Sequence, residues 1–117
     1  MKKHSEESSR KEAEFIVRAL DLEPGARVLD IGCGIGSWLA TLRKIGFKPV
    51  GLDVAKEVVD IRTGEGFEVW HGTVDSIERN WKEPSVCTCF FVLQHVPDPV
   101  GFLATIRSKF PKSTLVI

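Results

Sequence analysis

Three glycines at alternate positions, Gly32, Gly34 and Gly36, directly follow a segment at residues 28–31 that is apolar except for Asp30. Glycine adopts backbone conformations that other residues resist, and it lets a ligand approach the main chain closely. A helix that begins after such a turn presents free N–H groups and the positive end of its dipole to a ligand. The spacing therefore predicts a ligand-binding turn, although a simple tight turn is the alternative.

Two classes of ligand compete for this turn, and the residues around it distinguish them. Dinucleotides use the pattern GxGxxG, but Ser37 stands where the third glycine of that pattern would be. Asp30 lies just ahead of the glycines, and its carboxylate would repel a pyrophosphate but suits a positively charged ligand. S-adenosylmethionine carries an ammonium, a sulfonium and a carboxylate that backbone N–H groups can bind. The turn thus favours S-adenosylmethionine, and a nicotinamide-dependent oxidoreductase is the weaker alternative.

A second acid, Asp53, directly follows an apolar segment at residues 48–52. In dinucleotide folds the acid that binds the ribose hydroxyls lies about 20 residues beyond the glycines, and Asp53 has a similar offset from Gly32. A helical pattern follows at once, so an N-cap is the other role open to Asp53. We expect it to accept hydrogen bonds from a ribose diol.

The elements that must position these residues alternate along the chain. Apolar spacing and turn residues predict helices at 5–20, 37–45, 55–62, 76–81 and 99–109, and strands at 27–31, 48–52, 67–71, 86–93 and 114–117. Strands alternating with helices predict βαβ units, and nearly continuous apolar strands predict a sheet covered on both faces. We therefore expect an α/β fold with a doubly wound parallel sheet and one domain over residues 1–117.

Some helix ends have specific signals. Ser5 is the expected N-cap of the first helix, and Asp98 followed by Pro99 is typical of the start of the last one. Gly46 is the expected residue just past the end of the second helix, where glycine commonly adopts a positive φ.

Three segments resemble motifs of the class I S-adenosylmethionine-dependent methyltransferases of the small-molecule type, which include quinone-biosynthesis and other C- and O-methyltransferases. They are DIGCGIG at residues 30–36, GLDVAKEVV at 51–59 and FFVLQHVPDP at 90–99. The resemblance extends from about Leu22 to Ile117. It implies a Rossmann-like sheet of strand order 3-2-1-4-5, S-adenosyl-L-methionine as cofactor, and methyl transfer to a small-molecule acceptor.

The resemblance also implies roles for the glycine turn. Asp30, with the backbone of Gly32, Cys33 and Gly34, would hold the methionine part of the cofactor. A buried acid that caps the turn is the other role open to Asp30. We expect the side chain of Cys33 to pack rather than to react, since a reactive thiol needs a lowered pKa.

After the second and third strands, the resemblance implies contacts to ribose and adenine. Asp53 would bind the ribose hydroxyls, and Val54 would pack on the adenine. The family often has Gly-Asp after the third strand, with the acid reaching the adenine amino group. Here Thr73 stands in the acid's place, and the next acid is Asp75. The candidates for this contact are therefore Asp75, through a shifted loop, or Thr73 and the backbone beside it at Val74.

His95 is the candidate for a catalytic role. It follows the fourth predicted strand, so it lies at the ligand edge of the sheet. An imidazole with a pKa near neutrality suits a general base, but the family often has this histidine without using it as the base, and a structural role is favoured. Methyl transfer from a sulfonium mainly requires binding, alignment and desolvation of the reactants.

The length of the chain is a departure from the family. The family fold has seven strands, whereas this sequence ends within or at the end of the fifth. The chain is thus a fragment, a naturally short relative, or a subunit that dimerises through the exposed edge of the fifth strand. The alternative function is a non-catalytic cofactor-binding or interaction module. Residues 1–21 are the expected N-terminal helix, for which a solvated helix face and a lid on the cofactor are the two roles open.

Composition argues against several kinds of partner. Sixteen Lys and Arg residues balance sixteen Asp and Glu residues, whereas nucleic-acid binding usually leaves a basic excess. No apolar run is long enough to span a bilayer, and no signal-peptide pattern opens the chain. Three cysteines without metal-ligand spacing favour reduced thiols and no metal site. We expect a cytoplasmic protein that binds neither nucleic acid nor membrane.

Overall fold

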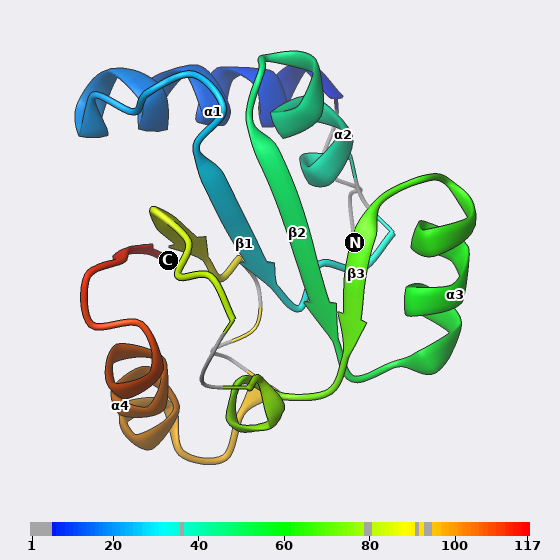
Figure 1. Cartoon of the computed structure of the whole chain (residues 1–117), viewed down its shortest axis with the longest axis vertical. Helices are drawn as coiled ribbons and strands as arrows, with labels where there is room; N and C mark the ends of the chain where they lie inside the picture. Colours follow the sequence, from blue (N-terminus) through cyan, green and yellow to red (C-terminus); the bar gives the residue numbers. More distant parts are fainter. Residues whose placement is uncertain (1–5, 36, 79–80, 91, 93–94) are drawn as a thin grey trace.

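The computed structural model describes residues 6–35, 37–78, 81–90, 92 and 95–117. Its centre is a five-stranded sheet in the order β3-β2-β1-β4-β5, and every neighbouring pair of strands is parallel (Figure 1). The order reverses between β1 and β4, as in a doubly wound sheet. The predicted fold class and strand order are confirmed.

The bounds of most elements follow the sequence patterns, with differences at the fourth strand and at the turn after β3. The strands are β1 (Arg27–Ile31), β2 (Lys48–Asp53), β3 (Glu68–His71), β4 (Val86–Thr88) and β5 (Thr114–Val116). The helices are α1 (Glu6–Leu20), α2 (Trp38–Lys44), α3 (Lys56–Gly64), the 3₁₀ turn η1 (Val74–Ser76) and α4 (Pro99–Lys109). None of the helices in the described ranges is long and apolar enough to cross a membrane.

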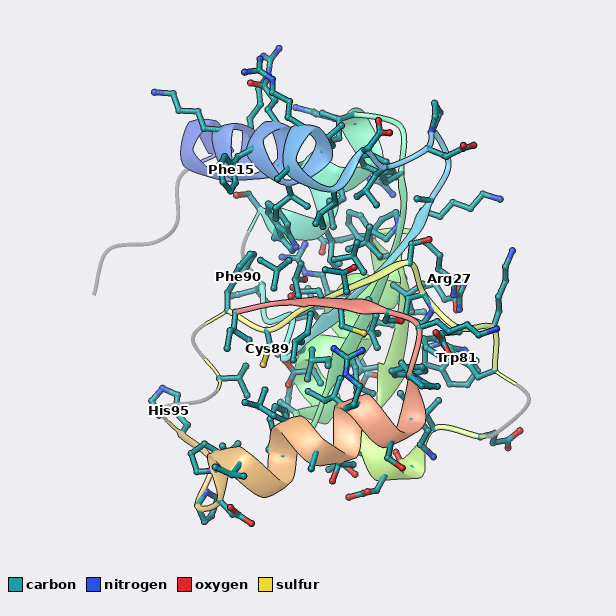
Figure 2. All side chains as sticks on the ribbon, turned by 90° about the vertical axis from the view of Figure 1, so that its left-hand side faces the viewer. Phe15, Arg27, Trp81, Cys89, Phe90 and His95 are labelled. Atoms are coloured by element: carbon teal, nitrogen blue, oxygen red, sulfur yellow. The ribbon has the colours of Figure 1, made fainter. Side chains whose placement is uncertain are left out.

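Helices cover both faces of the sheet, with α1 and α2 on one side and α4 on the other (Figure 2). On β1, the side chains of Leu29 and Ile31 belong to the core that includes Ile106 of α4. Val28, which alternates with them, belongs to the core that includes Trp38 of α2. Successive strand residues point to opposite faces, so burial on both sides explains the uninterrupted apolar pattern of this strand.

Two of the three predicted helix ends are confirmed. The Asp98 carboxylate accepts a hydrogen bond from the Gly101 N–H at 3.1 Å and caps α4, which begins at Pro99. Gly46 follows α2 with a φ of 99°, which glycine adopts readily. Ser5, the expected cap of α1, lies outside the described residues, as does Gly36 of the glycine turn.

The fourth strand is shorter than predicted. We expected residues 86–93, but β4 ends at Thr88, and part of the remainder lies outside the described residues. Phe90 instead packs edge-on against Trp38, with ring centroids 5.1 Å apart. The Val92 carbonyl accepts a hydrogen bond from the His95 N–H at 2.9 Å, which forms a turn. Cys89 still donates a hydrogen bond to the Val116 carbonyl of β5 at 2.9 Å, whereas Phe90 packs on α2 and Val92 lies against the glycine turn.

The helix predicted at residues 76–81 does not continue through its described residues beyond Ser76, and residues 79 and 80 lie outside the described part of the chain. The helical turn is η1, Val74–Ser76, and it ends at Ile77, whose backbone is extended. The Ser76 hydroxyl closes this turn: it accepts a hydrogen bond from the Thr73 N–H at 3.1 Å and donates one to the Thr73 carbonyl at 2.7 Å. Such local side-chain bonds compete with the backbone bonds of a continuing helix.

Candidate functional site

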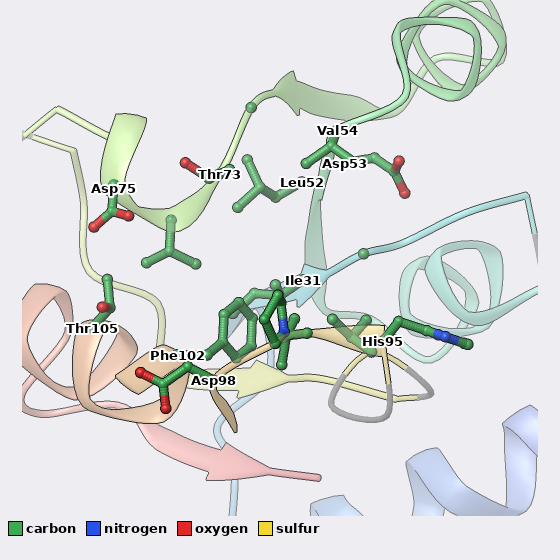
Figure 3. A pocket seen from close by; sticks show the side chains of 16 residues that line it. Ile31, Leu52, Asp53, Val54, Thr73, Asp75, His95, Asp98, Phe102 and Thr105 are labelled. Carbon is green, nitrogen blue, oxygen red and sulfur yellow. The ribbon is translucent and has the colours of Figure 1, made fainter. Parts of the chain in front are cut away.

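A cavity of about 620 Å³ lies at the carboxyl ends of the strands (Figure 3). One wall consists of residues at the ends of β1, β2 and β3 and in η1. The opposite wall consists of the segment after β4 and the first turns of α4. In open α/β sheets this edge, beside the reversal of strand order, is where ligands bind.

Most of the predicted cofactor-binding residues line this cavity. They are Gly32, Asp53, Val54, Thr73, Val74 and Asp75. The other three candidates, Asp30, Cys33 and Gly34, do not line it, and they lie in and beneath the glycine turn. The topology thus brings residues from three separate turns to one wall, while the ligand contacts of each residue stay a prediction.

Asp53 connects the turn after β1 to the turn after β2. Its Oδ2 accepts a hydrogen bond from the Gly34 N–H at 3.0 Å, and its Oδ1 accepts one from the Ala55 N–H at 2.9 Å. The N-cap position of α3 is Ala55, so Asp53 does not cap the helix in the usual way. A carboxylate has about four acceptor positions, so each oxygen keeps capacity for a further donor.

Arg62, which the sequence analysis did not single out, lies behind the same turn. It extends from α3, and its Nε donates a hydrogen bond to the Gly34 carbonyl at 3.0 Å. Its Nη1 donates to Glu65 at 3.1 Å, and the residue is only 5% exposed. In the sequence Arg62 resembles any polar residue of a surface helix, and no local signal marks it as a neighbour of the glycine turn.

Val92, which follows β4, lies against the glycine turn. Gly32 has a φ of 72°, a backbone conformation that favours glycine. A Cβ atom at this position would overlap the Val92 side chain. Gly32 is therefore required both by its backbone conformation and by the close approach of Val92, which also lines the cavity.

Asp30 is buried beneath the turn, with only 3% of its surface exposed. The Thr88 hydroxyl donates a hydrogen bond to Asp30 Oδ1 at 2.9 Å and accepts one from Trp38 Nε1 at 3.1 Å. Burial raises the pKa of Asp30 to about 7, against the lowering effect of the Thr88 hydrogen bond. The Asp53 charge adds to the rise and the Arg62 charge opposes it. Near neutral pH this carboxyl group is therefore only partly ionised.

The cysteines are packing residues. Cys33 belongs to a small core with Leu39 and Phe67, and burial raises the pKa of its thiol to about 12. Burial also raises the pKa of Cys87 to about 12 and that of Cys89 to about 11. All three are free thiols, and the described part of the chain holds no group of side chains suited to a metal ion.

The opposite wall is mainly apolar and includes Val96, Pro97 and Phe102. His95 also lines the cavity, and its ring extends away from Phe102 (Figure 3). Its side chain is exposed. The structure thus brings His95 to the predicted edge of the sheet, across the cavity from Asp53.

The family model for a methyltransferase domain matches residues 4–117 of this chain. The chain belongs to the class I S-adenosylmethionine-dependent methyltransferases. This methyltransferase domain is 38% identical over 91 residues to a ubiquinone biosynthesis O-methyltransferase of Aliivibrio fischeri (strain MJ11), covering 72% of this chain and 38% of the relative. The corresponding protein of Xanthomonas campestris pv. campestris (strain B100) is 30% identical over 108 residues, covering 80% and 43%. The methyltransferase domain thus spans about two-fifths of these relatives.

Solved structures of other methyltransferases share its fold. An amino pentose methyltransferase from Micromonospora echinaspora, solved with bound S-adenosylmethionine, has a TM-score of 0.74 at 20% identity, covering 94% of this chain and 47% of the other. The magnesium protoporphyrin IX methyltransferase from Synechocystis PCC 6803, also solved with this cofactor, has a TM-score of 0.72 at 19% identity, covering 88% and 53%. The methyltransferase domain therefore has the Rossmann-like fold of a family whose cofactor is S-adenosylmethionine.

Proposed function

We propose that this methyltransferase domain binds S-adenosyl-L-methionine in the 620 Å³ cavity and takes part in methyl transfer to a small molecule. One observation carries the proposal. Asp53 lines the cavity while its carboxylate accepts a hydrogen bond from the Gly34 N–H, so the acid at the end of β2 and the glycine turn after β1 are joined beside the cavity.

The residues around the cavity fit this cofactor. Asp53 retains acceptor capacity for the ribose hydroxyls, because its two hydrogen bonds use only part of what a carboxylate offers. Val54 and Leu52 offer apolar surface for the adenine. The backbone at Gly32 borders the cavity and suits the methionine end. Thr73, Val74 and Asp75 remain candidates for contacts at the adenine edge.

Asp30 has an indirect role in this proposal. Its carboxyl group is buried and bonded by the Thr88 hydroxyl, so it supports the turn electrostatically from beneath. Gly34 and Cys33 also support the turn without contacting the adenosine part. Gly34 does so through its backbone hydrogen bonds and Cys33 through the packing of its side chain. We expect none of these three residues to contact the adenosine part of the cofactor.

The cofactor, when bound, supplies a methyl group activated by a positively charged sulfur. The residues of this chain bind and align the reactants and exclude water from them. Val92, Val96 and Phe102 form an apolar wall opposite Asp53, which favours an acceptor with apolar surface. His95 is exposed on this side of the cavity and is the candidate to accept the proton that the acceptor loses.

The proposal also includes a cellular location for the protein. Three free thiols with raised pKa values support a reducing, cytoplasmic location.

A homodimer through the edge of β5 and a lid function for residues 1–21 stay predictions. In the described residues α1 packs against the core through Ala13 and Ile16. Sedimentation velocity, with a substitution of Leu115 by proline, tests the dimer, because Thr114 and Val116 bond toward β4 and the Leu115 backbone faces the free edge of β5.

The first experiment is calorimetric titration of the protein with S-adenosylmethionine, S-adenosylhomocysteine and NAD. We expect saturable binding of the first two and none of NAD, because the glycine spacing departs from that of a pyrophosphate-binding turn. Binding of NAD in place of the other two would contradict the proposal. Cofactor binding without methyl transfer to any phenol, amine or carboxylate acceptor would leave the non-catalytic binding module as the function.

A further inference from the structure

The buried guanidinium of Arg62 requires an explanation, because a cation is costly inside a protein unless it is paired and hydrogen-bonded. Its exposed fraction is 5%, although α3 is otherwise largely exposed. Nε donates to the Gly34 carbonyl at 3.0 Å and Nη1 donates to Glu65 at 3.1 Å. The guanidinium carbon also lies 5.6 Å from the centre of the Phe67 ring. Arg62 is thus directed away from solvent and toward the glycine turn.

The Gly34 residue is held from both sides. Its N–H donates to Asp53 Oδ2 at 3.0 Å, and its carbonyl accepts from Arg62 Nε at 3.0 Å. Gly34 has a φ of 56°, and glycine changes conformation at little steric cost. Two hydrogen bonds, one on each of its peptide units, therefore select one conformation of a residue that is otherwise free to adopt several. We call Asp53, Gly34 and Arg62 the Gly34 bracket.

We propose that Arg62 is a positioning residue for cofactor binding, which fixes the Gly34 peptide and thereby orients the Asp53 carboxylate toward the cavity. The inference rests on the proposed function, since it assigns the bracket to the binding of S-adenosylmethionine and S-adenosylhomocysteine. Arg62 itself does not touch the ligand. It acts through Gly34, so the turn that binds the methionine end and the acid that binds the ribose are held in one geometry before the ligand arrives.

Charge supports the same assignment. The Arg62 charge lowers the pKa of the buried Asp30, which lies beneath the turn, whereas the Asp53 charge raises it. A cation behind the turn therefore offsets the two carboxylates that lie close to it. A hydrogen bond to a charged donor is also stronger than one between neutral groups, which suits a contact that has to hold a mobile glycine.

Arg43 offers a matched control. Its guanidinium carbon lies 4.0 Å from the centre of the same Phe67 ring, but it extends from α2 and its side chain is exposed. Arg43→Met and Arg62→Met therefore remove the same charge and the same kind of cation–π contact from the same ring. Only Arg62→Met removes the hydrogen bond to Gly34. Arg62→Lys keeps the charge but loses the planar guanidinium with its fixed donors.

The experiment measures amide hydrogen exchange of Gly34 by NMR without ligand, and then the affinity for S-adenosylhomocysteine by calorimetry. Loss of a hydrogen bond to a charged group corresponds to about a tenfold change or more in an equilibrium. We expect exchange of the Gly34 amide to accelerate by about tenfold or more in Arg62→Met, and the affinity to fall by a similar factor. The Gly25 amide, which donates to the Gly46 carbonyl at 2.9 Å, serves as the internal reference. Arg43→Met should change neither quantity more than about twofold.

Several outcomes would overturn the inference. If Gly34 exchanges faster in Arg62→Met but the affinity is unchanged, the Gly34 bracket does not contribute to ligand binding. If exchange is unchanged, Arg62 does not hold the Gly34 peptide. Full recovery of both quantities in Arg62→Lys would mean that charge alone is sufficient. If Arg62→Met does not fold, Gly34 amide exchange and ligand affinity are compared between Arg62→Lys and the natural protein, and this comparison tests the inference. Failure of the natural protein to bind S-adenosylhomocysteine would instead contradict the proposed function, while the ligand-free exchange would still report on the bracket.

Discussion

Asp53 is the residue at which the turns after β1 and β2 meet, because its two oxygens bind the Gly34 and Ala55 N–H groups. We expect Asp53→Ala to lower the affinity for S-adenosylmethionine by about tenfold or more, since the ribose diol and the Gly34 N–H both lose a charged acceptor. Calorimetric titration measures the affinity, and circular dichroism checks that the fold survives.

Asp60→Ala is the control for this substitution. Asp60 is an exposed residue of α3 that pairs with Lys56 at 3.1 Å, and such surface pairs contribute little. We expect its removal to leave cofactor affinity unchanged. Equal affinities of Asp53→Ala and the natural protein would contradict the assignment of Asp53 to the ribose.

Asp30 makes the free energy of unfolding fall as pH rises, whereas a carboxylate with a lowered pKa makes it rise. Its pKa is raised from 3.8 to about 7 in the folded protein, so the folded state holds this proton over a range where the unfolded chain has lost it. Asp30 therefore lowers the free energy of unfolding as pH rises from about 4 to about 7. Asp30→Asn removes this dependence and should gain stability relative to the natural protein over that range, by a few kcal/mol at most.

Urea unfolding at pH 5 and pH 8, followed by tryptophan fluorescence, measures this difference. Asp60→Asn, at an exposed position, should show no comparable change between the two pH values. A stability difference between Asp30→Asn and the natural protein that is the same at both pH values would show that Asp30 has an ordinary pKa.

The Thr88 hydroxyl provides a second test of the buried network. It links Trp38 to Asp30, so Thr88→Val leaves two buried groups without this partner and should cost about 1–3 kcal/mol. Thr41 is also buried, but its hydroxyl has no hydrogen-bond partner among the residues that the structure describes, so Thr41→Val should be neutral or stabilising. Chemical denaturation of the two variants gives both values. A similar loss of stability in both variants would show that the hydrogen bonds of Thr88 are not the cause.

At the scale of elements, the glycine turn and α2 pack directly on β2. A Cβ atom at Gly51 of β2 would lie 2.7 Å from Cys33 Sγ and 3.2 Å from Leu39 Cδ1. We expect Gly51→Ala to destabilise the protein by about 1–3 kcal/mol, because the core is overpacked. It should also weaken cofactor binding, since Cys33 lies within the glycine turn. Thermal unfolding and calorimetric titration measure the two effects.

Gly64→Ala is the matched control for Gly51→Ala. Gly64 is the last residue of α3, and a Cβ atom there would meet no atom within 4 Å. Alanine is the better helix former by up to about 1 kcal/mol, so this substitution should be neutral or stabilising. Destabilisation of both variants to the same extent would mean that the close contact at Gly51 is not the cause.

At the scale of the whole molecule, the cavity lies between two parts of the sheet. The ends of β1, β2 and β3 form one wall, and the segment after β4 with α4 forms the other. A ligand that contacts both walls binds only the folded chain, so S-adenosylhomocysteine at 100 times its Kd should add about 2.7 kcal/mol to the free energy of unfolding. Differential scanning calorimetry should show a higher Tm with this ligand and an unchanged Tm with NAD. No shift at saturating concentration would mean that the cavity does not bind it.

The sequence by itself determined the alternation of strands and helices, the glycine turn and the position of Asp53 at the end of β2. These features depend on local patterns: apolar runs of strand length, helix-ending glycines, and an acid at a set distance from a glycine motif. Asp98 at the start of α4 belongs with them, because a capping residue acts on the backbone beside it.

Only the tertiary structure decided which distant residues support the site. Arg62 reaches Gly34 across 28 positions of sequence, and Thr88 reaches Asp30 across 58. Both contacts depend on which strands and helices become neighbours and in what register, as where Asp30 lies opposite Thr88 in the pairing of β1 with β4. The early end of β4 has the same origin, because burial around the glycine turn and pairing within a sheet both select apolar residues.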